Sequence, residues 1–286
     1  MSNLYPPAAS AEASPSPGGE PFAPPTWWSI VSGKGGVGKT SLAVNLSIAL
    51  AEAGARTLLV DGDLALANAD VLLGMAPAPS IESALLGEEP LLPHLLQGPH
   101  GLELLPGAAG SQLLAAVGRG RIRDLMSSVA GYARHHDIVL LDSPPGVGIS
   151  VLELVRTSHR TCLVLTPDPP AFTDAYALLK LIQRDAPESW VGLFVNRCRD
   201  GAEARDVVER FWRASERFLH CRPPWIGWLP EDAAVGRAVR TQDTFVLASP
   251  AAPASRHVRA LATDILHGSW ERSPEPDLAD NPEETI

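Results

Sequence analysis

The sequence feature that most constrains this chain is a glycine-rich segment at 33–40, which reads GKGGVGKT. A short apolar run at 28–31 precedes it, and a segment with apolar residues at helical spacing, 40–53, follows. The segment fits the pattern G-x-x-x-x-G-K-[ST], in which backbone N–H groups and the start of the next helix surround phosphate oxygens. We therefore expect a strand, a phosphate-binding loop and a helix.

This pattern assigns a role to each residue of the loop. The Lys39 ammonium is expected to reach the β- and γ-phosphates of a nucleotide, and the Thr40 hydroxyl is expected to ligate Mg²⁺. The nucleotide-contacting residues predicted here are Gly33, Gly35, Gly36, Val37, Gly38, Lys39, Thr40 and Ser41. A rival interpretation is a G-x-G-x-x-G dinucleotide-binding fold with Asp61 as its ribose acid, but that fold has no use for Lys39 and Thr40 together.

Short apolar runs alternate with amphipathic helical segments along most of the chain. The further apolar runs are 57–60, 102–105, 138–141, 161–165, 191–195 and 225–228, and the further helical segments are 119–134, 150–158, 170–186, 201–218 and 252–267. Continuous apolar runs are typical of strands buried on both faces. The alternation predicts an α/β fold, a single P-loop NTPase domain over 26–268 with a mostly parallel central sheet flanked by helices on both faces.

Both ends of the chain differ from this pattern. Residues 1–25 contain seven prolines and are expected to form a flexible arm, and 269–286 are expected to form an acidic, disordered tail. The formal net charge of −10 disfavours direct DNA binding. No signal sequence or apolar run long enough to span a membrane is found, so we expect a cytoplasmic protein. Cys162, Cys198 and Cys221 lack paired spacing and are expected to be reduced thiols.

Carboxylates follow two of the predicted strands. Asp142 ends the run at 138–141 and is expected to act on Mg²⁺, while Gly146 in the turn beyond it would offer its N–H to the γ-phosphate. Asp61 and Asp63 follow the run at 57–60; Asp61 is expected near the metal, and Asp63 is expected to orient the attacking water. A simple turn at Asp142 and helix capping by Asp63 are the structural alternatives.

Lys34 adds a second lysine to the loop, and the resulting K-G-G-V-G-K-T resembles the deviant phosphate loop of the MinD/ParA family of ATPases. The resemblance implies that Lys34 contacts the nucleotide on a second subunit, a cation supplied across a dimer interface. It also implies that Asn196 and the loop at Pro230 contact the adenine. Segments at 61–74, 173–180 and 238–242 are similar to the flagellar-number regulators of this family, FlhG and FleN.

The resemblance implies an ATP- and Mg²⁺-dependent dimerising switch that hydrolyses ATP slowly and controls the placement or number of a cellular structure. Its expected partners are a second copy and a flagellar GTPase or switch-complex component. Residues 1–27 lack the D-Q-A-type activating segment of FlhG proteins, and no basic amphipathic helix ends the chain, so membrane or cell-pole recruitment is expected to be weak or partner-mediated. A ParA-like DNA-partitioning ATPase and an iron-sulfur or metal carrier are the alternatives.

Overall fold

An eight-stranded sheet forms the centre of the computed structural model, which describes residues 24–63, 68–75, 90, 92–107 and 118–269. The strands are β1 (Thr26–Val31), β2 (Thr57–Asp61), β3 (Leu96–Gln97), β4 (Glu103–Leu105), β5 (Ile138–Asp142), β6 (Arg160–Leu165), β7 (Trp190–Cys198) and β8 (Trp225–Pro230). Their order across the sheet is β3-β4-β2-β5-β1-β6-β7-β8, with β3 antiparallel to β4 and the other pairs parallel. The predicted α/β class and mostly parallel sheet are confirmed.

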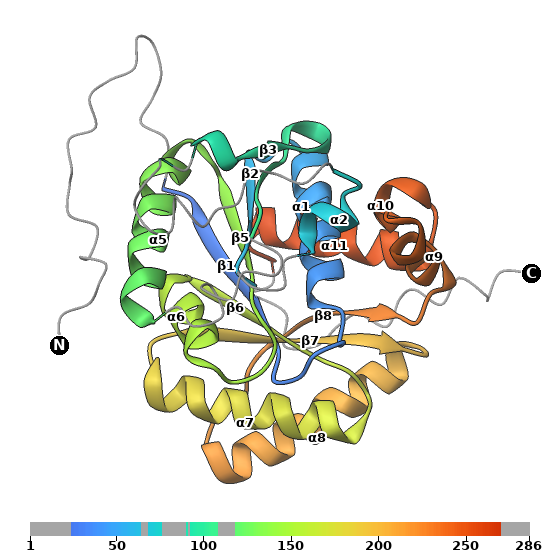
Figure 1. Cartoon of the computed structure of the whole chain (residues 1–286). Coiled ribbons are helices and arrows are strands. Elements are labelled where there is room, and N and C mark those ends of the chain that lie inside the picture. Colours follow the sequence, from blue (N-terminus) through green and yellow to red (C-terminus); the bar gives the residue numbers. More distant parts are fainter. Residues whose placement is uncertain (1–23, 64–67, 76–89, 91, 108–117, 270–286) are drawn as a thin grey trace, which may run out of the picture.

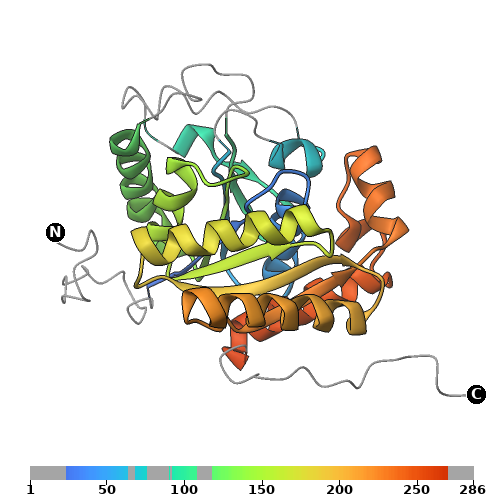
Figure 2. The ribbon, with the colours of Figure 1, turned by 90° about the horizontal axis from the view of Figure 1, so that it is seen from below.

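Helices cover both faces of this sheet. They are α1 (Lys39–Glu52), α2 (Ala69–Leu72), α5 (Arg119–Tyr132), α6 (Ile149–Thr157), α7 (Pro169–Asp185), α8 (Gly201–Leu219), α9 (Ala233–Thr241), α10 (Phe245–Ala248) and α11 (Pro253–His267), with short 3₁₀ turns at Leu92–His94, Pro99–Gly101 and Ala133–His135. Figure 1 shows α1 and α11 on one side of the sheet and α5 to α8 on the other. Figure 2 shows α7 and α8 running alongside the strands they cover.

The central strands are buried on both faces, which explains their continuous apolarity. Successive strand residues point to opposite faces, so Ile30 packs into the cluster that contains α1 and α11, while Val31 packs into the cluster that contains α6, α7 and α8. Both side chains are fully buried. A sheet covered on both sides leaves the strand ends as the places where polar side chains can meet a ligand.

Four elements were not among the predicted strands and helices: β3, α2, α9 and α10. β3, α2 and α10 span four residues or fewer, which is too short to show a hydrophobic period, whereas α9 spans nine residues and was missed. Most of the predicted arm at 1–25 and all but one residue of the predicted tail at 269–286 lie outside the described residues, so both remain predictions. Within the part of the chain that the structure describes, no helix is long and apolar enough to cross a membrane.

Two phenylalanines on α8 provide a matched test of this arrangement. Phe211 is fully buried between α8 and the sheet, whereas Phe218 is 63% exposed. We expect Phe211→Ala to lower the free energy of unfolding by about 3–5 kcal/mol because it removes a core ring and leaves a cavity. Phe218→Ala should change it by no more than about 0.5 kcal/mol. Urea unfolding followed by tryptophan fluorescence measures both, and equal effects would contradict the described packing of α8.

Candidate nucleotide site

The glycine-rich loop connects the end of β1 to the start of α1. Gly38 precedes α1 with φ 94°, a left-handed conformation that favours glycine, and its carbonyl accepts the first helical bond from Leu42 N at 2.9 Å. A Cβ at Gly38 would also collide with the side-chain amide of Asn196 from β7. The loop therefore takes the predicted strand-loop-helix form, and glycine is required both for its conformation and for the approach of its neighbour.

Two other elements hold the loop in place. The Asn196 side-chain amide donates to the carbonyl of Val37 at 2.7 Å, a buried hydrogen bond between residues 159 positions apart. At the other end of the loop, a Cβ at Gly33 would collide with the backbone carbonyl of Asp174 in α7. The loop is thus held between β7 and α7, and these two contacts fix its backbone before any ligand binds.

Lys39 lies inside the loop and is 6% exposed. Burial lowers the pKa of the Lys39 ammonium, and the nearby carboxylates of Asp142 and Asp63 oppose that change. The structure therefore brings three predicted site residues, Lys39, Asp63 and Asp142, close enough to interact electrostatically. A buried ammonium in an amide-lined loop suits a phosphate ligand, because a bound anion offsets the desolvation of its charge.

Asp61 and Asp142 are neighbours in the sheet, paired across β2 and β5, and each is 1% exposed. The Asp61 carboxylate accepts three backbone N–H bonds, from Asp63 at 3.1 Å, Asn68 at 3.0 Å and Ala69 at 3.1 Å. Burial raises the pKa of the Asp61 carboxyl, and these hydrogen bonds oppose the rise. Asp61 is therefore engaged in anchoring the chain on both sides of segment 64–67, which lies outside the described residues.

Asp142 differs from Asp61 in its partners. Both of its carboxylate oxygens are buried without a hydrogen bond of normal geometry among the described residues. Burial and the adjacent Asp61 carboxylate raise the pKa of the Asp142 carboxyl, while the Thr40 hydroxyl and the Lys39 ammonium oppose that rise. Buried acids usually have partners, so an acid without them beside a hydroxyl indicates a place for a cation.

This donor set fits Mg²⁺ held by a nucleotide rather than a cation held by protein alone. Mg²⁺ commonly takes one or two carboxylate ligands and completes its shell with phosphate oxygens and water. Thr40 and Asp142 supply such a partial set, and Asp61 lies beside it. Accordingly, no cluster of three or more His, Cys, Asp or Glu ligands occurs among the residues described.

Lys34 lies on the outer side of the loop, unlike Lys39. Its ammonium is 3.1 Å from the carboxylate of Asp168, and both side chains are more than two-fifths exposed. The same carboxylate accepts hydrogen bonds from the Thr166 hydroxyl and from the N–H of Ala171 at the start of α7, at 3.2 Å for the latter. These donors lower the pKa of the Asp168 carboxyl. Lys34 is therefore tethered to α7 by an exposed ion pair.

The remaining predicted contacts lie at neighbouring strand ends. The N–H of Gly146 donates to the Ser32 carbonyl at 3.0 Å, so Gly146 lies beside the loop with its N–H already engaged. The side-chain oxygen of Asn196 accepts a hydrogen bond from the N–H of Arg197 at 2.9 Å, so both the donor and the acceptor of this amide are engaged. Pro230 ends β8 and pairs in register with Cys198 of β7. Their roles toward a nucleotide remain predictions.

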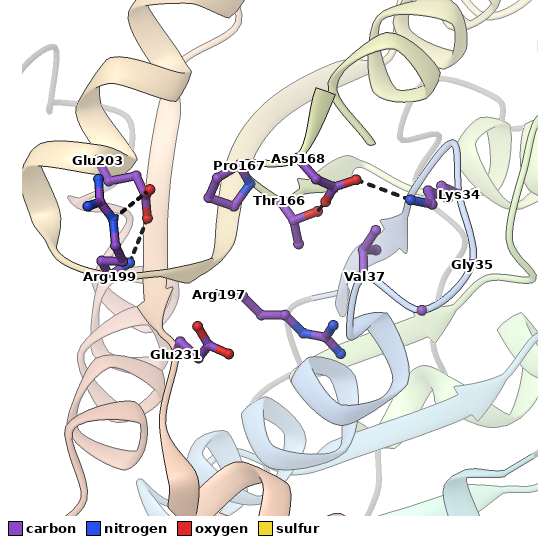
Figure 3. Close-up of a pocket in the computed structure, with 11 residues that line it drawn as sticks. Lys34, Gly35, Val37, Thr166, Pro167, Asp168, Arg197, Arg199, Glu203 and Glu231 are labelled. Atoms are coloured by element: carbon purple, nitrogen blue, oxygen red, sulfur yellow. Dashed lines mark hydrogen bonds and ion pairs between the residues drawn. The ribbon is translucent and has the colours of Figure 1, made fainter. Parts of the chain in front are cut away.

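A pocket of about 360 Å³ opens beside the loop (Figure 3). Lys34, Gly35, Gly36 and Val37 form one wall of it. The ends of β6, β7 and β8 and the first turn of α8 supply the other walls. Our sequence analysis did not select these residues, which are Thr166, Pro167, Asp168, Arg197, Arg199, Glu203 and Glu231. All of them except Glu203 lie within four residues of the end of a predicted buried strand, and parallel strands end at one edge of the sheet, so their position in the sequence was a usable signal.

The two ends of the loop give a stability test. Gly33→Ala should destabilise the protein by about 3 kcal/mol or more, because the added methyl group would meet the backbone of α7, which cannot rotate away as a side chain can. Gly36→Ala is the matched control: Gly36 has φ 76° but open space around its Cβ position, so we expect a loss of about 1–2 kcal/mol from backbone strain alone. Urea unfolding compares them, and a smaller effect at Gly33 would contradict the contact with α7.

The chain matches known proteins over this same region. Residues 26–266 match the ParA family profile, described as NUBPL iron-transfer P-loop NTPase. The antiactivator FleN of Pseudomonas aeruginosa is 34% identical over 247 residues, covering 86% of this chain and 88% of FleN. The flagellum site-determining protein YlxH of Helicobacter pylori is 31% identical over 212 residues, covering 74% of this chain and 71% of YlxH.

The fold has a match among solved structures as well. The septum site-determining protein MinD from Pyrococcus horikoshii OT3, solved as a complex with Mg-ADP, superposes with a TM-score of 0.71 at 25% identity, over 86% of this chain and 98% of that one. The resemblance to MinD, ParA and the flagellar regulators is thus confirmed. With the two-lysine phosphate loop and the buried acids beside it, these matches show that the chain belongs to the ParA/MinD family of P-loop NTPases.

Proposed function

We propose that this protein is an ATP-dependent switch that dimerises with ATP and Mg²⁺, hydrolyses ATP slowly, and controls the placement or number of a cellular structure of the flagellar type. The observation that carries the proposal is the different exposure of the two lysines of the phosphate loop. Lys39 is buried among acids, whereas Lys34 is exposed on the outer face and available to a second molecule. The name of YlxH, a flagellum site-determining protein, supports the flagellar client.

Within one subunit, the proposed roles follow from burial and charge. Lys39 and the loop amides hold the phosphates, and Thr40 and Asp142 hold Mg²⁺, which neutralises phosphate charge when bound. Asp63 orients the attacking water, since it lies two residues beyond Asp61, past the end of β2, and near Lys39. Asp61 holds the loop that carries Asp63, because its carboxylate accepts the Asp63 N–H.

Across the proposed dimer interface, Lys34 supplies a positive charge to the partner's nucleotide. Its ion pair with Asp168 is exposed, and exposed pairs contribute about 0–1 kcal/mol, so Lys34 is easily released. Exposed apolar side chains near the strand ends that hold the site support a protein contact there: Val147 at 44% and Ile149 at 50% beyond β5, and Val71 at 40% in α2 after β2.

The alternatives account less well for the described residues. For a DNA-partitioning ATPase, the three arginines at the start of α5, Arg119, Arg121 and Arg123, should be available to phosphates. Instead, Arg119 and Arg123 face the buried Glu153 of α6, at 3.7 and 2.9 Å. For a metal carrier, thiolates should be reachable, but Cys162 and Cys198 are buried in strands and burial raises the pKa of both thiols. The switch remains the favoured function.

The partner and the place of action are part of the same proposal. A second copy of the chain and a flagellar GTPase or switch-complex component are the proposed partners. We place the protein in the cytoplasm, with recruitment to the inner face of the membrane or to a cell pole through a partner. Affinity capture with Asp63→Ala, with and without ATP, would identify the client.

The switch itself is tested by light scattering. Asp63→Ala should bind ATP and remain a dimer of twice 30.3 kDa, because it loses the group that orients water and keeps the phosphate contacts. Its turnover should fall by about 10²-fold or more. Lys39→Ala should stay monomeric in ATP because its loop cannot hold the phosphates. A monomeric Asp63→Ala protein with ATP bound would contradict the proposed switch.

The role of Lys34 is tested by complementation. Lys34→Ala should bind ATP yet lose about 10³-fold in turnover, as expected when a charge supplied in trans is removed. Mixing Lys34→Ala with Asp63→Ala should restore activity, because a mixed dimer has one site with its own Asp63 and a lysine from its partner. Lys180→Ala on α7 serves as the control for loss of a lysine and should match the wild type. Absence of restoration would exclude a contact in trans.

A further inference from the structure

The C-terminal half of α8 carries a basic surface that has no part in the proposed switch. Arg210, Arg213 and Arg217 are exposed and lie at i, i+3 and i+7, the spacing that places side chains on one face of a helix. Arg222, which is also exposed, follows just beyond the end of the helix. We call these four residues the arginine cluster.

Acidic neighbours lie beside two members of the cluster. Arg213 is 4.0 Å from Glu209, and Arg222 is 3.3 Å from Glu216. All four side chains are between 47% and 68% exposed, and exposed pairs of this kind contribute about 0–1 kcal/mol. Both arginines can therefore exchange these partners for others at little cost.

The other two members keep their charge free. Arg210 donates to the backbone carbonyl of Asp206 at 3.3 Å, and the Arg217 guanidinium lies 5.1 Å from the centre of the Phe218 ring. Neither arginine forms an ion pair within the part of the chain that the structure describes. Phe218 is 63% exposed. Arginine and exposed aromatic rings together are typical of a surface that another segment covers.

The end of α11 lies near the same end of β8 as this surface. The ring centres of Trp228 and His257 are 4.5 Å apart, and a Cβ at Gly227 would lie 3.8 Å from the Leu261 side chain, so α11 runs antiparallel to β8. The C-terminal end of α11 therefore lies toward the start of β8. α8 leads into that same start through residues 220–224, and β8 is at the edge of the sheet.

The segment that follows α11 carries the opposite charge. Residues 270–286 lie outside the described residues, and their sequence contains one base, Arg272, and six acids: Glu271, Glu275, Asp277, Asp280, Glu283 and Glu284. At about 3.3 Å per residue, this segment can span about 56 Å. The way round the edge strand to the face that α8 covers is about two helix diameters, or about 20–24 Å. The segment is therefore long enough to reach the arginine cluster.

We propose that residues 270–286 dock on the arginine cluster of the same molecule, with their carboxylates facing its guanidinium groups. Guanidinium and carboxylate groups match in charge and in hydrogen-bonding geometry. Because the segment is linked to the surface, its effective concentration is high, and several individually weak pairs give a populated contact. The docked segment keeps other polyanions off the cluster. This contact lies away from the nucleotide site and goes beyond the switch proposed above.

Trypsin can report on this contact in the full-length protein. Outside the described residues, Arg272 is the only lysine or arginine of the chain, and cleavage after it releases residues 273–286. Mass spectrometry follows the rate of this release. Arg213→Glu/Arg217→Glu should release the fragment about fivefold faster, as expected if the segment is docked about four-fifths of the time in the wild type.

A second variant removes the charge from the other side of the contact. Asp277→Asn/Asp280→Asn/Glu283→Gln/Glu284→Gln should give the same acceleration, and its combination with the α8 variant should give no more, because both remove one interaction. Sodium chloride at about 0.5 M should bring the wild type close to this rate by screening the charges. Synthetic peptides of residues 269–286, with and without the four substitutions, correct for any direct effect on trypsin.

The matched control is Arg237→Glu/Arg240→Glu, which makes the same change of charge on exposed residues of α9, beyond the other end of β8. It should release the fragment at the wild-type rate, and equal acceleration would indicate a general effect of charge and overturn the proposal. So would equal rates in the wild type and the first two variants. Protection that rises with protein concentration would place the segment on a second copy instead. A wild-type protein that binds a short DNA duplex as tightly as the variant with the neutral segment would show that the cluster is open.

Discussion

The site depends on how firmly the phosphate loop is held by the rest of the fold. Its two ends are fixed by different elements: Gly33 abuts the backbone of α7, and the Val37 carbonyl accepts a buried hydrogen bond from Asn196. A loop with four glycines in the segment 33–38 would otherwise lose much conformational entropy when it closed on a phosphate. Because the fold has already ordered it, more of the binding energy remains available for affinity.

The acids at the strand ends show how a sheet assigns different roles to similar residues. Asp61 and Asp142 pair across neighbouring strands with the same burial, yet Asp61 accepts three backbone hydrogen bonds and Asp142 accepts none of normal geometry. The first stabilises a loop, and the second is left for a cation. A buried carboxyl that accepts no hydrogen bond of normal geometry is unfavourable for the protein without its ligand, so its presence is more readily explained by binding than by stability.

The contrast between the two loop lysines follows the same logic. Lys39 is buried, and burial lowers the pKa of its ammonium, so a bound phosphate would stabilise the charged form. Lys34 points outward, where water keeps its ion pair with Asp168 weak and therefore exchangeable. A buried lysine suits permanent contact with a subunit's own nucleotide, and an exposed lysine suits a contact that forms and breaks with each cycle.

The sequence by itself determined the α/β class, most of the strands and helices along the chain, the phosphate loop and the acids at the ends of β2 and β5, because these depend on local periodicity and a dense motif. The tertiary structure decided which acid is left without hydrogen bonds, which carboxylate pairs with Lys34, and which side of the sheet edge Arg197 lines. Those outcomes depend on pairing between strands and on a bulge in β7, which bring together residues far apart in the chain. No local pattern encodes such distances, so sequence reasoning could not have reached them.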